Sequence, residues 1–147
     1  MRKSIFIGII LTSIIASCGK PATNNGQPLN HTGDNTTIWI GTYTGTVGGT
    51  NTLNKVVVSK VNDSVVSMQL QTNVSGQYYT YATLQNVMLT TTTSATINEN
   101  GLIASYTDIY HFAGSALLNG NNLTVSGTGT STTNSSDVKV YYFSGNK

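Results

Sequence analysis

The sequence predicts an all-β fold, an antiparallel meander of eight or nine strands that closes into a barrel. Three observations support this prediction. Apolar and polar side chains alternate with a period of two, Thr, Val and Tyr are abundant, and turn residues recur at short intervals. Branched and aromatic side chains suit a pleated surface, and no window shows an apolar stripe at helical spacing. A two-sheet β-sandwich is the alternative architecture.

The first residues are typical of an export signal. Arg2 and Lys3 form a positive start, residues 5–15 form an apolar run, and small residues lead to Cys18. A helix of that run spans about 16 Å, against roughly 30 Å of bilayer hydrocarbon, so it is too short to remain as a membrane span. We therefore expect residues 1–17 to be a cleaved signal peptide.

The residues directly behind the apolar run, Ile15-Ala16-Ser17-Cys18, resemble the lipobox of bacterial lipoproteins. In that family the cysteine thiol carries a diacylglycerol, and the amino group that cleavage exposes is often acylated as well. The resemblance implies that fatty acyl chains such as palmitate are attached at Cys18. Two or three chains would hold the protein on the membrane permanently, since a single chain binds only marginally.

Two further features of this region concern the compartment. Cys18 is the only cysteine, so the exported domain has no internal disulfide and no metal site built from cysteines. Gly19 stands where an aspartate would, in the best-known sorting rule for lipoproteins, favour the inner membrane. The resemblance therefore implies a cell-envelope protein anchored in the outer membrane, facing the periplasm or the surface.

The charge of the mature chain argues against a nucleic-acid partner. The whole chain has 7 basic residues (Lys and Arg) against 5 acidic ones. Arg2 and Lys3 belong to the signal, and without them the two signs are equal in number. No excess of positive charge is left to bind a phosphate backbone.

The composition divides the mature chain in two. Residues 18–37 are rich in Pro, Gly, Asn and Thr and nearly free of apolar side chains. Such a segment cannot bury enough surface to offset its ordering entropy, which predicts a flexible tether behind the acylated cysteine. Residues 38–147 carry the alternating runs and are long enough for one modest core. They are expected to form a single β-barrel domain.

The strands are expected from residue 38 onward. A clear example of the alternation is Val66, Met68 and Leu70, which are separated by polar residues. Near the C-terminus, Val138 and its period-two partners lie on the face opposite Lys139 and are expected inside. The expected strands cover residues 38–47, 54–61, 64–72, 77–84, 87–97, 102–106, 109–118, 122–130 and 137–144.

Three polar pairs or triplets are the expected tight turns. Asn100-Gly101 is the strongest two-residue hairpin signal, because both positions tolerate a positive φ. Asn62-Asp63 and Asn119-Gly120-Asn121 each separate two alternating runs. Sequential strands joined in this way favour a closed barrel, which leaves no exposed strand edges.

The two ends of the domain carry a second resemblance. It opens with Trp39-Ile40-Gly41-Thr42-Tyr43 and ends with Phe143-Ser144-Gly145-Asn146-Lys147. Such a start, a meander and a terminal Phe-x-Gly-x-Lys resemble the small lipocalin-like β-barrel lipoproteins of anaerobic gut-type bacteria. Lipocalins proper have Gly-x-Trp in the first strand, whereas the order is reversed here. The resemblance therefore implies the architecture and no particular ligand.

Residues that could carry catalysis are few. The histidines are His31 in the tether and His111 in a strand, and an offset of three places Asp108 and His111 on opposite faces of a continuous strand. Glu99 lies in an expected turn, and Gly127-Thr128-Gly129 lacks the helix that a phosphate-binding loop requires. The sequence thus predicts a protein that is not an enzyme, with no catalytic residue, no metal site and no cofactor.

Aromatic side chains are the candidate ligand contacts. Trp39 and Tyr43 are spaced to share a strand face, which would form either the floor of a ligand site or a plug at one end of the barrel. Tyr79 and Tyr81 share another face, and Tyr110 lies in a later strand. A tyrosine combines an apolar ring with a hydroxyl tip, which suits a pocket mouth, a sugar platform or a protein interface. Simple packing of half-buried strands is the competing interpretation.

These observations lead to two hypotheses of function. The first is a lipid-anchored envelope lipoprotein whose barrel is a non-catalytic or accessory domain that binds a small apolar or amphiphilic molecule. The second is an envelope interaction module that binds glycan or protein through Tyr-rich strands. In addition, Asp63-Ser64-Val65 resembles the acceptor tripeptide of an O-glycosylation system of some envelope bacteria, which would make Ser64 the modified residue.

Overall fold

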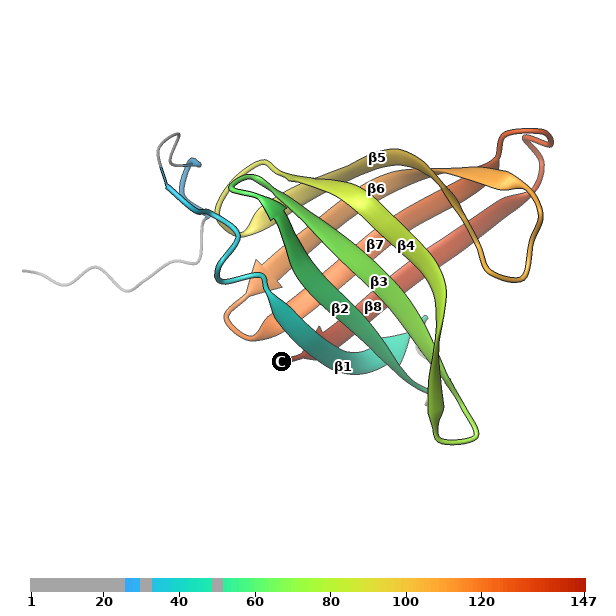
Figure 1. Ribbon diagram of the computed structural model, residues 1–147, viewed down its shortest axis with the longest axis horizontal. Coiled ribbons are helices and arrows are strands. Elements are labelled where there is room, and N and C mark those ends of the chain that lie inside the picture. Colours follow the sequence, from blue (N-terminus) through green and yellow to red (C-terminus); the bar gives the residue numbers. More distant parts are fainter. Residues whose placement is uncertain (1–25, 30–32, 49–51) are drawn as a thin grey trace, which may run out of the picture.

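Antiparallel strands follow one another in chain order and close into a barrel (Figure 1). The computed structural model describes residues 26–29, 33–48 and 52–147. Over these residues there are eight strands, each hydrogen-bonded to the next, and the last is bonded to the first. This arrangement confirms the predicted all-β barrel and excludes the sandwich. The strands are β1 (Gly41–Val47), β2 (Leu53–Asn62), β3 (Val65–Val74), β4 (Gln77–Leu89), β5 (Ser94–Leu102), β6 (Ile109–Asn119), β7 (Asn122–Ser131) and β8 (Val138–Asn146).

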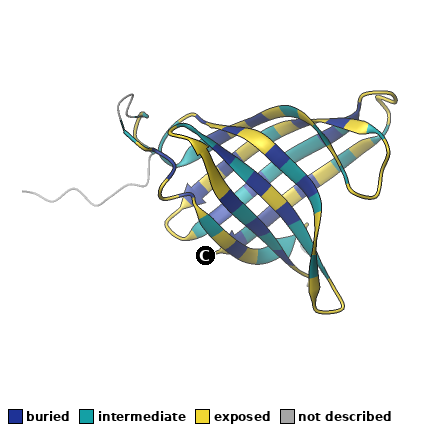
Figure 2. Cartoon of the chain, in the orientation of Figure 1, coloured by how far each residue is buried: buried dark blue, intermediate teal, exposed yellow. Residues whose placement is uncertain are grey.

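The barrel interior is filled by the side chains that face inward at every second position. Buried and exposed residues alternate along the strands in Figure 2. Val66, Met68 and Leu70 on β3 are buried, as their alternation predicts, and they belong to one core cluster with residues of all eight strands. Burying such a side chain stabilises the fold by roughly 1.5–3 kcal/mol, so the inward faces hold the barrel together.

The face of β8 that points inward differs from the expectation. Val138, Val140 and Tyr142 are exposed, Val140 to 79%, and the inward side chains include Tyr141 and Phe143. Both faces of this strand carry apolar residues, so the alternation alone does not decide between them. The two large rings bury more apolar area than two valines would, and they determine which face of β8 points inward.

The Asn100-Gly101 turn was a wrong prediction, and the count of strands falls to eight as a result. Gly101 lies inside β5 and pairs with Tyr110 on β6. The turn lies earlier, at residues 90–93, where the backbone N–H of Thr90 donates to the carbonyl of Ser94 (2.8 Å). Of the expected strand 102–106, Leu102 ends β5 and the rest lies in the loop between β5 and β6, where Ile103 makes only an isolated bridge to Ala82.

The side chain of Glu99 explains why β4 runs on where a break was expected. One carboxylate oxygen accepts the backbone N–H of Gln85 (2.8 Å) and the other accepts that of Asn86 (2.9 Å). Glu99 therefore lies in β5 and not in a turn, and it satisfies two donors where β4 and β5 are not paired directly. The regular pairing of these two strands covers only Met88–Leu89 and their partners Thr96 and Ala95.

The other two expected turns are present. Residues 63 and 64 connect β2 to β3, and Gly120, with a φ of 58°, connects β6 to β7. The β3–β4 hairpin turns at Ser75 and Gly76, both with positive φ, and extends beyond the rest of the barrel (Figure 1).

Closure of the barrel depends on a close approach between β1 and β8. Gly45 and Gly145 are directly paired across this seam. A Cβ atom on Gly45 would overlap the carbonyl oxygen of Ser144, and one on Gly145 would meet the Phe143 ring. Glycine is therefore required at both positions of this seam.

The N-terminal residues cover one end of the barrel, the end that also holds the C-terminus (Figure 1). Trp39 precedes β1 in a turn, is 0% exposed, and donates its indole N–H to the carbonyl of Thr92 (2.8 Å). Tyr43 donates its hydroxyl to the carbonyl of Trp39 (2.9 Å). We call this end, closed by Trp39, the closed end, and the opposite one the open end.

Part of the segment expected as a tether also lies on the closed end. Pro28 forms a bridge with Thr91, the carbonyl of Gln27 accepts the N–H of Thr92 (2.9 Å), and Leu29 packs against the core. An ion pair between Asp34 and Lys60 (2.7 Å) adds a second attachment. The described residues of this segment thus contact the barrel at several points, although their composition is that of a linker.

Candidate functional site

A cavity of about 450 Å³ lies at the open end of the barrel. It is bounded by the last residue of β1, the first part of β2, the later half of β3 and the loop between β5 and β6. Its volume falls in the range of roughly 300–1,000 Å³ that is usual for small-molecule sites. The residues that line it are Val47, Thr52, Asn54, Leu70, Thr72, Tyr81, Ile103, Tyr106, Phe112, Lys139, Val140 and Tyr141.

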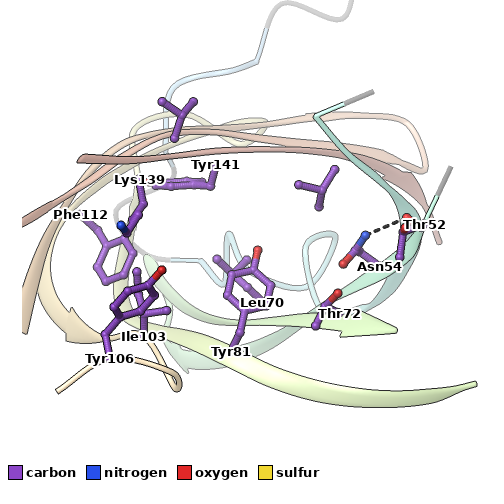
Figure 3. A pocket seen from close by; sticks show the side chains of 12 residues that line it. Thr52, Asn54, Leu70, Thr72, Tyr81, Ile103, Tyr106, Phe112, Lys139 and Tyr141 are labelled. Atoms are coloured by element: carbon purple, nitrogen blue, oxygen red, sulfur yellow. Dashed lines mark hydrogen bonds between the residues drawn. The ribbon is translucent and has the colours of Figure 1, made fainter. Parts of the chain in front are cut away.

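Most of the cavity wall is apolar, and four aromatic rings contribute to it. Phe112 and Tyr141 form an edge-to-face pair with ring centroids 6.0 Å apart. Tyr81 and Tyr106 also line the cavity, and their hydroxyl groups point into it (Figure 3). A ligand with flat or extended apolar parts would therefore meet carbon on most sides and hydroxyl groups at a few defined points.

Glycines behind two of these rings let them lie flat against the barrel wall. The ring of Tyr141 crosses Gly127 and Gly114, where a Cβ atom would come within 2.8 Å of the tyrosine hydroxyl. The ring of Phe112 lies between Gly101 and Gly129, each with a Cβ position 3.1 Å from a ring carbon. Because the rings occupy the space of missing side chains, the centre of the open end remains hollow.

The hydroxyl of Tyr141 is the one buried side-chain polar atom without a hydrogen-bond partner among the described residues. Burial raises the pKa of Tyr141 to about 12, and the charges of Glu99 and Tyr81 act in the same direction. Leaving such a group unsatisfied costs roughly 1–3 kcal/mol, so this part of the barrel wall is not optimised for stability.

Lys139 is the only charged side chain among the described residues that line the cavity. Its ammonium donates to Asp137 (2.5 Å) and lies 4.7 Å from the centre of the Tyr106 ring. Asp137 also accepts the hydroxyl of Tyr110 (2.8 Å). The hydrogen bond with Asp137 raises the pKa of Lys139, and the bonds from Lys139 and Tyr110 lower that of Asp137, so both remain charged at neutral pH.

A second polar group of side chains lies across the cavity from Lys139. Asn54 is buried, and its amide nitrogen donates to the carbonyl of Thr52 (2.8 Å). The amide oxygen of Asn54 and the hydroxyl of Thr72 point toward the cavity (Figure 3). These atoms offer hydrogen bonds without charge, which distinguishes this side from the Lys139 side.

The five tyrosine and tryptophan residues expected as ligand contacts do not form one site. Tyr81 lines the cavity, whereas Trp39 and Tyr43 are buried at the closed end. Tyr110 is buried below the mouth with its hydroxyl on Asp137, and Tyr79 is 57% exposed on the projecting β3–β4 hairpin. Sequence reasoning thus found one of the lining aromatics among its candidates.

The main lining residues that sequence reasoning missed are Phe112, Tyr141 and Lys139. A signal for the first two was present in Gly127-Thr128-Gly129, since two glycines at strand spacing mark places where rings from neighbouring strands lie. Lys139 was expected outside because β8 was assigned the opposite face. The choice of which face of β8 points inward therefore determines whether Lys139 places a positive charge at the open end.

The weak catalytic candidates are held apart by different partners. Asp108 accepts the hydroxyls of Ser131 (2.8 Å) and Thr133 (2.6 Å), and these bonds lower its pKa. His111 is exposed and its Nδ1 contacts the amide oxygen of Asn100 (3.0 Å). In the part of the chain that the structure describes, no three His, Cys, Asp or Glu side chains gather where a metal ion could bind.

Other sequence features can be located only in part. Cys18 and His31 lie outside the described residues. Ser64 lies in the β2–β3 turn, where its backbone N–H donates to the side-chain oxygen of Asn62 (2.9 Å). Within the described ranges, no helix has the length and apolar character needed to cross a membrane.

A second hollow of about 430 Å³ lies over the β4–β5 seam, where the two strands diverge. Tyr81 lines both this hollow and the cavity at the open end. The ring of Tyr81 therefore stands between the barrel interior and the outer seam.

The fold and this site define a small antiparallel barrel that its own N-terminal segment closes at one end and that is hollow at the other. The chain was compared with models of protein families, with curated proteins and with solved structures, and none of the three comparisons gave a match.

Proposed function

We propose that this chain is a lipid-anchored envelope lipoprotein whose barrel binds a small apolar or amphiphilic molecule at its open end, without catalysis. One observation carries the binding part of the proposal. The barrel interior is packed at the closed end, but at the open end it leaves a mainly apolar cavity of about 450 Å³. An eight-stranded barrel is wide enough to hold one small ligand when its own side chains do not fill it.

The residues around the cavity support the non-catalytic part of the proposal. Hydrolytic and transfer reactions use an acid and a base, or a nucleophile and a base, within hydrogen-bond reach of each other. The described lining offers one ammonium group, three tyrosine hydroxyls and neutral polar groups. Such a set binds and orients a molecule, and this supports a carrier or sensor more than an enzyme.

The anchoring part rests on the lipobox-like residues that end at Cys18. The chain that leads back to Cys18 departs from the closed end, because residues 26–29 lie against the β4–β5 turn there. A lipid anchor at Cys18 would therefore leave the open end on the side of the barrel away from the attachment. The mouth of the cavity would then be accessible to molecules in the surrounding aqueous compartment.

Mass spectrometry of the protein extracted from membranes of its native host tests both parts. We expect a peptide that begins with acylated Cys18, and a small molecule that co-purifies with the chain in addition to its anchor. Replacing Thr72 with Trp would fill the cavity and remove the co-purifying molecule. Thr128→Trp, on the outer face of β7, is the matched control and should retain it.

Two results would contradict the proposal in different ways. A native polypeptide that begins at Met1, with an unmodified Cys18, would remove the anchor. A co-purifying molecule that Thr72→Trp and Thr128→Trp retain equally would remove the cavity as its site.

The projecting β3–β4 hairpin supports a second candidate, an interaction module for glycan or protein. Tyr79 is exposed on this hairpin, and the ammonium of Lys55 lies 3.8 Å from the centre of the Tyr78 ring. Tyrosines of this kind are frequent in interfaces. If the hairpin is the binding surface, Tyr79→Ala should abolish retention of the chain on envelope glycan or protein, whereas Thr72→Trp should not.

A further inference from the structure

We propose that the ligand of the open-end cavity is an amphiphile with a carboxylate head, which pairs with Lys139 at the mouth while its apolar tail lies against Leu70, Ile103 and Phe112. This inference rests on the proposed binding function and goes beyond it by naming the class of ligand.

Lys139 lies on the inward face of β8. It pairs with Gly129, two positions before the pair of Tyr141 with Gly127, and both Tyr141 and Phe143 on this face are buried. The side chain of Lys139 is 36% exposed, so its ammonium is at the mouth and not in bulk water. A lysine that faces into a barrel loses hydration, and this loss favours a negatively charged partner.

The ammonium of Lys139 has capacity left for such a partner. It has three N–H donors, of which one is used by Asp137, while a face of the ammonium lies over the Tyr106 ring. Asp137 is bound by Tyr110 as well, so its charge is shared between two donors and does not depend on Lys139 alone. A ligand carboxylate can therefore join the ammonium without leaving Asp137 unpaired.

The nearby hydroxyl groups fit the same head group. The ring of Tyr106 contacts the Lys139 ammonium, and the hydroxyls of Tyr106 and Tyr81 point into the same cavity (Figure 3). Burial raises the pKa of Tyr81, so its hydroxyl keeps its proton at neutral pH and can donate it in a hydrogen bond. The described lining residues thus offer hydroxyl donors and the positive charge of Lys139, and they include no acidic side chain. Such a lining selects for an anion.

The deeper wall fits an apolar tail. Leu70 and Phe112 are buried core residues that also line the cavity, and Ile103 packs against the core from the loop between β5 and β6. Moving each CH₂ of a tail from water to such a wall is favourable by about 0.8 kcal/mol. A tail of several carbons would therefore contribute most of the affinity, and the head would determine orientation and selectivity.

Calorimetric titration with a matched pair of probes tests this assignment. The full lipidated chain in lipid nanodiscs is titrated with decanoate and with 1-decanol, and the heats from empty nanodiscs are subtracted. We expect decanoate to bind about tenfold more tightly than 1-decanol, as one charge-assisted hydrogen bond provides. Lys139→Met should weaken decanoate binding by about the same factor and leave 1-decanol binding unchanged.

Two further variants make the test specific. Lys55→Met removes a lysine that also lies on a tyrosine ring but outside the cavity, and it should bind both probes like the unmodified chain. Asp137→Asn removes the competing carboxylate and keeps the ammonium, so decanoate binding should be retained or strengthened. This variant preserves the test if Lys139→Met does not fold.

The possible failures are distinguishable. If the unmodified chain binds neither probe, the proposed binding function itself is wrong. If it binds both probes equally and Lys139→Met changes neither, the binding function stands and the carboxylate assignment is wrong. Equal loss of both probes in Lys139→Met would show that Lys139 shapes the cavity and does not recognise charge, which also overturns the assignment.

Discussion

The two ends of this barrel use the same kinds of residue for different purposes. At the closed end, the polar atoms of Trp39 and Tyr43 donate to carbonyls of the protein itself, and both side chains are fully buried. At the open end, the hydroxyls of Tyr81 and Tyr106 point into a cavity, and that of Tyr141 is buried without a partner. An aromatic side chain therefore becomes part of a plug when backbone carbonyls surround it, and part of a site when they do not.

The largest expected difference between the ends is in stability. Trp39→Ala removes the plug and a hydrogen bond to Thr92, and replacing a buried aromatic side chain with alanine costs roughly 3–5 kcal/mol. Tyr106→Ala at the open end removes a side chain that is 45% exposed, and we expect a loss below about 1 kcal/mol. Urea denaturation of the two variants measures both values. Equal losses would contradict the division into a plug and a site.

The next largest effect on stability is expected at the open end, where Gly127 lies behind the Tyr141 ring. Gly127→Ala places a Cβ in overlap with the carbonyl oxygen of Ala113 and 2.5 Å from the Tyr141 hydroxyl, so the β6 backbone must shift and the ring must move into the cavity. Overpacking of this kind typically costs about 1–3 kcal/mol. Thermal unfolding measures the loss, and probe titration should show weaker binding of apolar molecules. The prediction fails if stability falls while binding of the probes is unchanged.

A Tyr→Phe substitution should change the free energy of unfolding in opposite directions at the two ends. Tyr141→Phe removes a buried hydroxyl that has no partner, and we expect it to stabilise the fold by about 1 kcal/mol. Tyr43→Phe removes the donor to the Trp39 carbonyl, and we expect a destabilisation of about 1 kcal/mol. Both variants are compared with the unmodified chain by urea denaturation. A destabilising Tyr141→Phe would show that its hydroxyl has a partner in solution.

The smallest expected effect is the response to acid at the closed end. The hydrogen bond from Lys60, helped by those from Thr36, holds the pKa of Asp34 well below its ordinary value of 3.8. A carboxyl whose folded pKa is lowered contributes stability above the unfolded value, and this contribution is lost as the pH falls below about 4. We expect the melting temperature to fall over this window and Asp34→Asn to reduce the slope. An unchanged slope in Asp34→Asn would show that Asp34 does not stabilise the closed end.

The sequence predicts the strands and two of the turns of the barrel well, because the signals for them are local. Alternation identifies β3, and the turns at Asn62-Asp63 and Asn119–Asn121 are correctly placed. The spacing of Trp39 and Tyr43 already suggests a plug as one of two interpretations, although Trp39 precedes β1 and does not lie in it. Each of these features depends on residues close together in the chain.

The open end could not be predicted to the same degree, since it depends on packing between distant strands. Asn100-Gly101 has the composition of a turn, but Gly101 lies within β5, where the absence of a side chain leaves room for the Phe112 ring. Which face of β8 points inward depends on whether β7 leaves space for Tyr141, and Lys139 faces inward as a consequence. These relations join residues from three or four strands, which a periodicity in one strand does not reveal.

Chemical-shift mapping by NMR tests the division between the two ends most directly. Decanoate is titrated into the chain in nanodiscs, and backbone amide and indole signals are followed against empty-nanodisc and 1-decanol controls. Saturable shifts are expected at Val47, Tyr81 and Lys139, with none at the indole N–H of Trp39. Saturable shifts at Trp39 and Thr92, with the open-end signals unchanged, would contradict the assignment of the cavity as the binding site.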